Sequence, residues 1–156
     1  MATDLQRGIL AGAAGTAALN VVTYLDMAVR GRPSSKVPAQ TAQRLADEAG
    51  ADLAPRGDDQ TAKNRSQGLG ALLGYVTGIG IGAVYGVVRP RTTEVPVPVA
   101  GVALGLAAMA GSDVPASTLD VTDPRQWGVS GWVSDIIPHM LYGVVTAAAY
   151  EAIGSR

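Results

Sequence analysis

The chain has 156 residues and a formal charge of −1 at pH 7, which suits one domain and does not favour nucleic acid as a partner. It contains no cysteine, which excludes structural disulfides and thiolate metal sites. Hydrophobic residues make up 47% of the sequence, yet phenylalanine is absent and 20 residues are glycine. Soluble cores normally use larger side chains to fill their volume, whereas helices in lipid pack through small ones.

This pattern predicts an all-α protein, a polytopic membrane protein in which residues 1–156 form a single membrane domain. Four apolar segments are expected to cross the bilayer as a four-helix transmembrane bundle with Gly-rich packing: residues 8–29, 68–88, 97–114 and 132–153. About 20 residues of helix cross a hydrocarbon layer of about 30 Å. Inside lipid the backbone must satisfy its own hydrogen bonds, so such segments become helical.

The first segment, residues 8–29, combines a glycine for helix packing, Gly12, with the polar residues Asn20 and Asp26. Polar side chains are expensive in lipid, so these two are candidates for a polar pathway. The segment ends at Arg30, which begins a basic and helix-breaking stretch.

A polar connection of residues 31–67 follows, and part of it is expected to be helical. Apolar residues recur at helical spacing up to Gly50, which supplies a stop. We predict a short amphipathic helix over residues 38–49, lying at the membrane surface or against the bundle, or forming a solvated linker. Asp58 and Asp59 are expected to cap an extension of the second transmembrane helix into water.

The second segment, residues 68–88, holds the most informative pattern of the chain. Five glycines fall four residues apart: Gly70, Gly74, Gly78, Gly82 and Gly86. In lipid such a row lets a second helix approach closely, as in GxxxG pairs. Four residues advance a helix by about 400°, so the row swings through about 160° and one straight partner cannot touch all five glycines. We expect two neighbours to share it, Gly70 and Gly74 facing one, Gly82 and Gly86 the other.

The third segment, residues 97–114, offers Gly101 and Gly105 as helix-packing positions. A polar stretch that includes Asp113 interrupts it. The third helix is therefore expected to be broken or re-entrant, or to continue through the interruption to Leu119.

The fourth segment, residues 132–153, has the best set of polar residues, with Gly143 beside them as a packing position. Asp135, His139 and Tyr142 follow spacings that put them on one helix face, and Asp135 can hydrogen-bond His139 one turn away. The candidates for a proton relay are Asp135, His139, Tyr142, Asp113, Asp26 and Asn20.

Enzyme chemistry is not expected. The chain has one histidine, no cysteine and no nucleophile–base–orienter set. The glycines between Gly78 and Gly82 do not form a dinucleotide fingerprint, because they lie inside a membrane-length run. Ligand spacing beyond Asp135 and His139 is missing, so we expect no metal and no cofactor.

The distribution of Lys and Arg predicts the orientation in a plasma (inner) membrane. The side with both termini holds Arg7, Arg89, Arg91 and Arg156. The other side holds Arg30, Arg32, Lys36, Arg44, Arg56, Lys63, Arg65 and Arg125. The excess predicts a cytoplasmic first connection, with both termini outside.

A glycine-rich first segment is combined with a His-x-x-Tyr-Gly element in the last one. The residues concerned are Gly8, Gly12 and Gly15 at the start, and His139, Tyr142 and Gly143 at the end. In these features the chain resembles the YagU-like group of small bacterial inner-membrane proteins, and its alanine- and valine-rich style is similar to that of proteins from high-GC actinobacteria. The resemblance implies a multi-span inner-membrane protein with a link to acid tolerance and no catalytic residues.

Two function classes remain, and both have the lipid bilayer as a partner. The first is a non-enzymatic structural, interaction or accessory membrane protein whose glycine faces bind another membrane protein or a second copy, as a homo-oligomer. The second is an oligomeric conduit for protons, ions or a small solute, built on the polar stripe of Asp135 and His139. The glycine row favours the first class.

Overall fold

The computed structural model describes residues 2–54 and 57–154; Arg56 and Arg156, which entered the charge count, lie outside the described residues. Within these ranges the secondary structure is helical without strands, which confirms the predicted all-α class. The elements in chain order are α1 Asp4–Arg30, α2 Val37–Glu48, α3 Asp59–Val88, the 3-10 turn η1 Arg89–Arg91, α4 Val97–Thr118, the 3-10 turn η2 Pro124–Gln126 and α5 Val129–Gly154.

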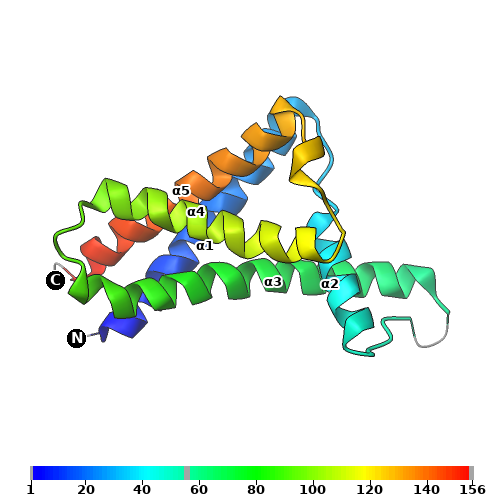
Figure 1. Ribbon diagram of the computed structural model, residues 1–156, viewed down its shortest axis with the longest axis horizontal. Coiled ribbons are helices and arrows are strands. Elements are labelled where there is room, and N and C mark those ends of the chain that lie inside the picture. Colours follow the sequence, from blue (N-terminus) through cyan, green and yellow to red (C-terminus); the bar gives the residue numbers. More distant parts are fainter. Residues whose placement is uncertain (1, 55–56, 155–156) are drawn as a thin grey trace.

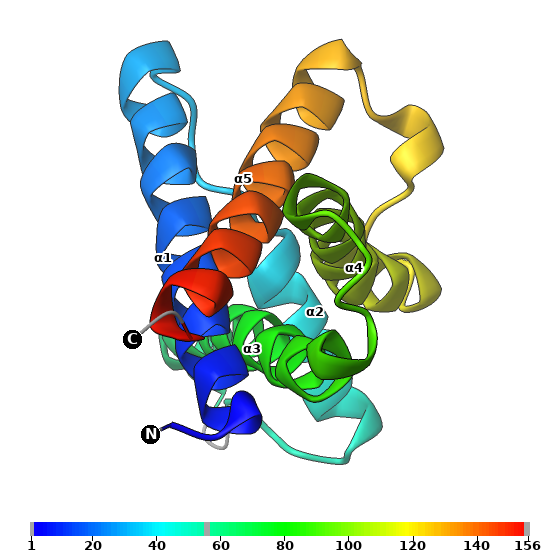
Figure 2. The same cartoon turned by 90° about the vertical axis from the view of Figure 1, so that its left-hand side faces the viewer.

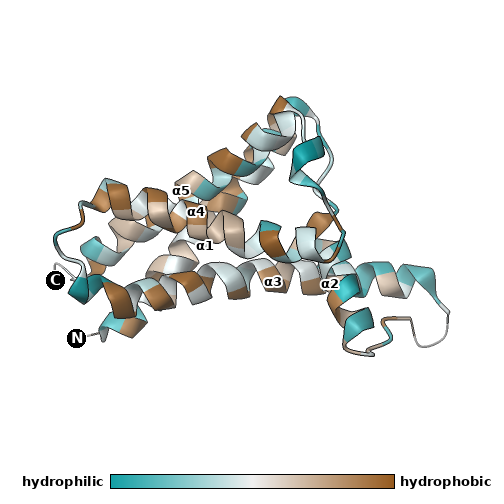
Figure 3. Cartoon of the chain, in the orientation of Figure 1, coloured by the Kyte–Doolittle hydropathy of each residue, from teal (hydrophilic) through white to brown (hydrophobic). Residues whose placement is uncertain are grey.

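In the described part of the chain, α1, α3 with η1, α4 and α5 are long and apolar enough to cross a membrane. Large apolar side chains cover their outer surfaces; Val76, for example, is 68% exposed. Figure 3 shows hydrophobic residues along these helices and hydrophilic ones at α2, in the connections and at the start of α3. Such a surface suits lipid rather than water, as expected of a multi-pass membrane protein.

The four long helices form a wedge rather than a parallel bundle. Helix α5 packs between α1 and α4, and α1 also packs on α3 (Figure 2). The helices meet at the end that carries both termini and diverge toward the end where α2 lies (Figure 1). We call these the termini end and the α2 end.

Helices α1 and α3 touch through backbone, because glycines face each other where they cross. A Cβ atom on Gly82 would lie 2.5 Å from the Gly8 carbonyl oxygen and 2.5 Å from Gly12 Cα. One turn further, Gly86 lies against the carbonyl of Asp4. No larger residue fits at this crossing without moving a helix.

Helices α4 and α5 also touch through the backbone of facing glycines. Gly143 lies directly against the Gly101 carbonyl and the Gly105 backbone. A Cβ on Gly105 would lie 2.8 Å from the carbonyl oxygen of His139. The glycines predicted to pack in the third and fourth segments therefore contact each other.

Two neighbours share the glycine row of α3, but not as predicted. A Cβ on Gly70 would lie 2.6 Å from the Pro38 carbonyl. This end of the row therefore packs against α2 and not against a membrane-spanning helix. Gly78 faces Thr16 of α1, next to the crossing at Gly82. The expectation that Gly74 shares the neighbour of Gly70 is wrong, because a Cβ there would meet no atom of another residue within 4 Å. The turn of about 40° per step carries Gly74 into the space between the two partners.

Helix α2 packs on α3 and buries Thr41 and Ala42, so it lies against the bundle and is not a solvated linker. The polar start of α3 extends beyond the apolar run, and its N-cap is Asp58, as expected. The Asp58 side chain accepts a hydrogen bond from the Gln60 amide at 3.0 Å.

The third span is one continuous helix, α4, which is the second of the two predicted alternatives. The helix runs through Ser112 and Asp113 and keeps Pro115 inside its last turn. Pro115 removes one backbone donor in the last turn, and so one hydrogen bond of the helix. Backbone bonding resumes at once, since the Leu119 amide donates to the Pro115 carbonyl at 3.0 Å.

Candidate functional site

Four polar side chains of α4 and α5 meet between the two helices toward the α2 end. We call Ser112, Asp113, Asp135 and His139 the α4–α5 cluster. His139 Nδ1 lies 2.8 Å from the Asp135 carbonyl oxygen and 3.3 Å from Asp135 Oδ1. On the other side of the ring, Nε2 lies 3.4 Å from Ser112 Oγ. The structure thus brings the polar stretch of the third segment to the Asp135–His139 pair of the fourth.

The hydrogen bonds define which histidine nitrogen can exchange a proton. A carbonyl oxygen only accepts hydrogen bonds, so Nδ1 of His139 carries a hydrogen and donates it to Asp135. The second nitrogen, Nε2, then gains or loses the exchangeable proton. Its neighbour Ser112 has a hydroxyl, which can either donate or accept.

The cluster holds two carboxyl groups beside one imidazole. Ser112 Oγ lies 3.4 Å from Asp113 Oδ1, and the Asp113 carboxyl is close enough to interact with both Asp135 and His139. Fully ionised, these three groups carry a net charge of −1. An ionic group between apolar helices is costly, so binding one proton, which makes the cluster neutral, is a natural response of this arrangement.

One atom of the cluster is unsatisfied. Asp135 Oδ2 is buried and has no hydrogen-bond partner within residues 2–54 and 57–154. Asp135 lies six residues after the start of α5 at Val129, about 9 Å along the helix. The cluster is therefore close to the membrane surface on the α2 side.

Asp26 and Asn20, the predicted relay residues of α1, make contacts outside the cluster. Asp26 forms ion pairs with Arg30, at 2.7 Å, and with Arg32. Arg30 in turn donates to Ser130 of α5 at 3.0 Å, so this set ties α1 to α5 at the α2 end. Asn20 lies apart from the cluster and donates to the Tyr75 hydroxyl of α3 at 3.4 Å. Two guanidinium groups therefore hold the Asp26 carboxylate, and its part in a relay stays a prediction.

Tyr142 is buried at the centre of the wedge, with 1% of its surface exposed. Its hydroxyl donates to the Gly78 carbonyl of α3 at 2.6 Å, a contact between α5 and α3. Tyr142 therefore lies deeper than the cluster and is not one of its hydrogen-bonded members.

A polar network at the termini end was missed by reasoning from sequence. Arg89 is buried; its Nε lies 2.7 Å from Glu151 Oε1, and its Nη1 donates to the Thr92 and Val95 carbonyls at 2.8 Å each. This guanidinium joins α5 to the turn between α3 and α4. Sequence reasoning counted Arg89 only as a topological charge.

Tyr150 makes further contacts between helices at the termini end. Its hydroxyl donates to Asp4 Oδ1 at 3.0 Å, and the Arg7 guanidinium lies 4.1 Å above its ring. Its ring also packs edge-on against Tyr85, with centroids 5.1 Å apart. These contacts join α5 to α1 and to α3 at the termini end.

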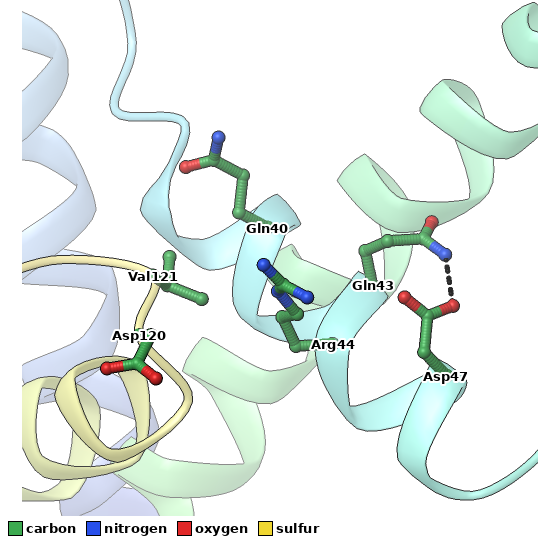
Figure 4. A pocket seen from close by; sticks show the side chains of 6 residues that line it. All are labelled: Gln40, Gln43, Arg44, Asp47, Asp120 and Val121. Carbon is green, nitrogen blue, oxygen red and sulfur yellow. Dashed lines mark hydrogen bonds between the residues drawn. The ribbon is translucent and has the colours of Figure 1, made fainter.

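A pocket of about 250 Å³ lies at the α2 end, outside the cluster. It is lined by Gln40, Gln43, Arg44, Asp47, Asp120 and Val121. Figure 4 shows these side chains where α2 faces the turn after α4, and Gln43 donates to Asp47 at 2.8 Å. The lining is exposed and mixed in charge, and it includes no member of the α4–α5 cluster.

Within the described residues, groups of three or more His, Cys, Asp or Glu side chains arranged to hold a metal ion are absent. No protein-family model matches the chain, and neither the curated proteins nor the solved structures with which it was compared gave a match.

Proposed function

We propose that this chain is a small, non-enzymatic, multi-pass membrane protein that conducts protons, with the α4–α5 cluster as its proton-exchanging group. The observation that carries the proposal is the placement of His139 between Asp135 on Nδ1 and Ser112 on Nε2, in helices whose outer faces are apolar. Ionisable groups held between apolar helices are functional candidates, because charge is costly to keep there.

The packing of the glycines supports this choice over an interaction role. The GxxxG row of α3 was the main reason to expect a partner protein, but Gly78, Gly82 and Gly86 contact α1 within the same chain. The packing needs of these glycines are met internally, so they no longer call for a partner.

For the location we propose the plasma membrane of a bacterium, with the α2 end in the cytoplasm and both termini outside. The basic residues of α2 and its flanking connections support this orientation. The cluster then exchanges protons with the cytoplasm. A proton-exchanging role fits the acid-tolerance link that the YagU-like resemblance implies.

Removing either partner of the central pair should abolish proton flux. The purified full-length protein is reconstituted into vesicles that contain a pH-sensitive dye, and a potassium potential drives proton entry. His139→Gln removes the exchanging nitrogen, and Asp135→Asn removes the carboxylate beside it. Each variant is expected to lower the flux at least tenfold.

Glu94→Gln is the matched control, because it removes an exposed carboxylate outside the helices. It should leave the flux unchanged. Wild-type vesicles that conduct no better than empty ones, or equal flux in all the variants, would rule out the proposed function.

A second candidate is an accessory protein that binds another membrane protein or a second copy. It is favoured by the exposed Gly80 of α3, where a Cβ atom would meet no atom of another described element within 4 Å. Native mass spectrometry in mild detergent should then show an oligomer or a bound partner, and Gly80→Leu should dissociate it. A clean monomer that purifies alone would contradict this role.

A further inference from the structure

Polar side chains follow the inner face of α5 from the α4–α5 cluster to the termini end. After Asp135 and His139 come Tyr142, Thr146 and Tyr150, which are 1%, 0% and 2% exposed. From Asp135 to Tyr150 the helix rises about 22 Å, most of a hydrocarbon layer of about 30 Å. We call these five residues the α5 line.

Two hydroxyls on the side of this path toward the termini end are unsatisfied. Thr146 Oγ1 and the Tyr85 hydroxyl are buried and have no hydrogen-bond partner in the described part of the chain. The same holds for Asp135 Oδ2 at the start of the line. Buried polar groups nearly always have partners, in protein or in ordered water, and at membrane depth an unmet one is costly. Three such atoms along one path point to a chain of hydrogen bonds completed by water.

The side chains between these atoms lie close together. A Cβ on Gly15 would meet the Thr146 hydroxyl and would lie 2.9 Å from the Tyr142 ring, so both side chains share one contact point on α1. Beyond them, Tyr85 packs against Tyr150 with ring centroids 5.1 Å apart. The Tyr150 hydroxyl donates to Asp4 at the membrane surface.

We infer that protons cross the protein along the α5 line, from the α4–α5 cluster to Asp4, inside a single protomer. This inference rests on the proposed function and adds its route and its substrate class. It replaces the expectation that a conduit requires an oligomer, because the line lies among α1, α3 and α5 of one chain.

Each step conserves atoms and charge. A hydroxyl accepts a proton on its oxygen and gives its own proton to the next acceptor, water or hydroxyl, then rotates back. Tyr142 takes part by turning its hydroxyl away from the Gly78 carbonyl, which it otherwise binds at 2.6 Å. At the end of the line, Tyr150 passes a proton to Asp4 and takes one from the preceding water. No group is oxidised or reduced.

The width of the path distinguishes protons from metal cations. A Cβ on Gly15 would lie 2.8 Å from the Tyr142 carbonyl oxygen, so α1 and α5 are in backbone contact there. A hydrated ion does not fit between them, whereas a proton needs only a chain of hydrogen bonds. The substrate class is therefore the proton alone.

The test compares two substitutions at Thr146 in the vesicle assay of the full-length protein. Thr146→Val keeps the shape but removes the hydroxyl, and it should lower proton flux at least tenfold. Thr146→Ser keeps the hydroxyl and should retain most of the flux. Tyr142→Phe should also lose flux, and Tyr24→Phe, on the 62% exposed Tyr24, should not. All four variants are first checked for wild-type elution in detergent, and sodium and potassium uptake is expected to be absent.

The outcomes separate this inference from the proposed function. Flux that is lost in Asp135→Asn but unchanged in Thr146→Val and Tyr142→Phe would overturn the α5 line and leave the cluster as a proton-exchanging site. Sodium or potassium uptake equal to proton uptake would overturn the substrate class. Absence of flux in the wild type would overturn both proposals.

Discussion

Replacing Gly82 with leucine should prevent the bundle from folding. The atoms that a side chain would meet are the backbone of α1, at 2.5 Å from the Gly8 carbonyl oxygen and from Gly12 Cα. Backbone cannot turn aside as a flexible side chain can, so α1 would have to leave α3. Even Gly82→Ala should destabilise the protein by about 1–3 kcal/mol through overpacking.

The glycine row of α3 supplies its own controls. Gly74→Leu should fold normally, because no atom of another residue lies within 4 Å of the new Cβ. Gly78→Leu should destabilise the protein more than Gly74→Leu and less than Gly82→Leu. Its new side chain meets the Thr16 hydroxyl and the Tyr142 ring, which are side chains and can move. The yield of monodisperse protein in detergent and its thermal unfolding midpoint measure the order of these three effects. Equal effects at Gly74 and Gly82 would show that the crossing is elsewhere.

Replacing Arg89 with alanine should lower the free energy of unfolding by about 1–3 kcal/mol. The guanidinium is 8% exposed and satisfies the Glu151 carboxylate and two carbonyls of the turn between α3 and α4. Its loss leaves the two turn carbonyls without this donor, and an unsatisfied buried acceptor costs about 1–3 kcal/mol. The Glu151 side chain is 41% exposed, so water can solvate it when the guanidinium is removed. Unfolding followed by helical circular dichroism in detergent measures the change.

Arg91→Ala is the matched control for Arg89→Ala, because Arg91 lies two residues after Arg89 in the same 3-10 turn. Arg91 is exposed and donates only to the Val87 carbonyl, at 2.6 Å, so its loss should cost less than about 1 kcal/mol. Arg89→Lys should recover only part of the stability, because an ammonium cannot reproduce the planar fork of donors. A similar loss in Arg89→Ala and Arg91→Ala would mean that the network at the termini end does not hold the helices together.

The sequence by itself determined the elements of this protein. Apolar runs of membrane length define the four long helices, because a backbone in lipid must bond to itself. Asp58 was recognisable as a cap, since its carboxylate stands just before a helix and can accept from the first free amides. The Asp135–His139 contact was also predictable, because residues four apart on a helix are neighbours whatever the tertiary structure.

Only the tertiary structure decided which faces meet, because the crossing of two helices depends on all their contacts together. Small changes in crossing angle move a contact by a full turn, so sequence spacing could not tell that Gly74 stays free while Gly82 packs. The same holds for polar residues. The ion pairs of Asp26 with Arg30 and Arg32 were not anticipated, and Asp113 joined the cluster because α4 runs on without a break. Local periodicity determines which residues share a helix face, and packing between helices determines what that face touches.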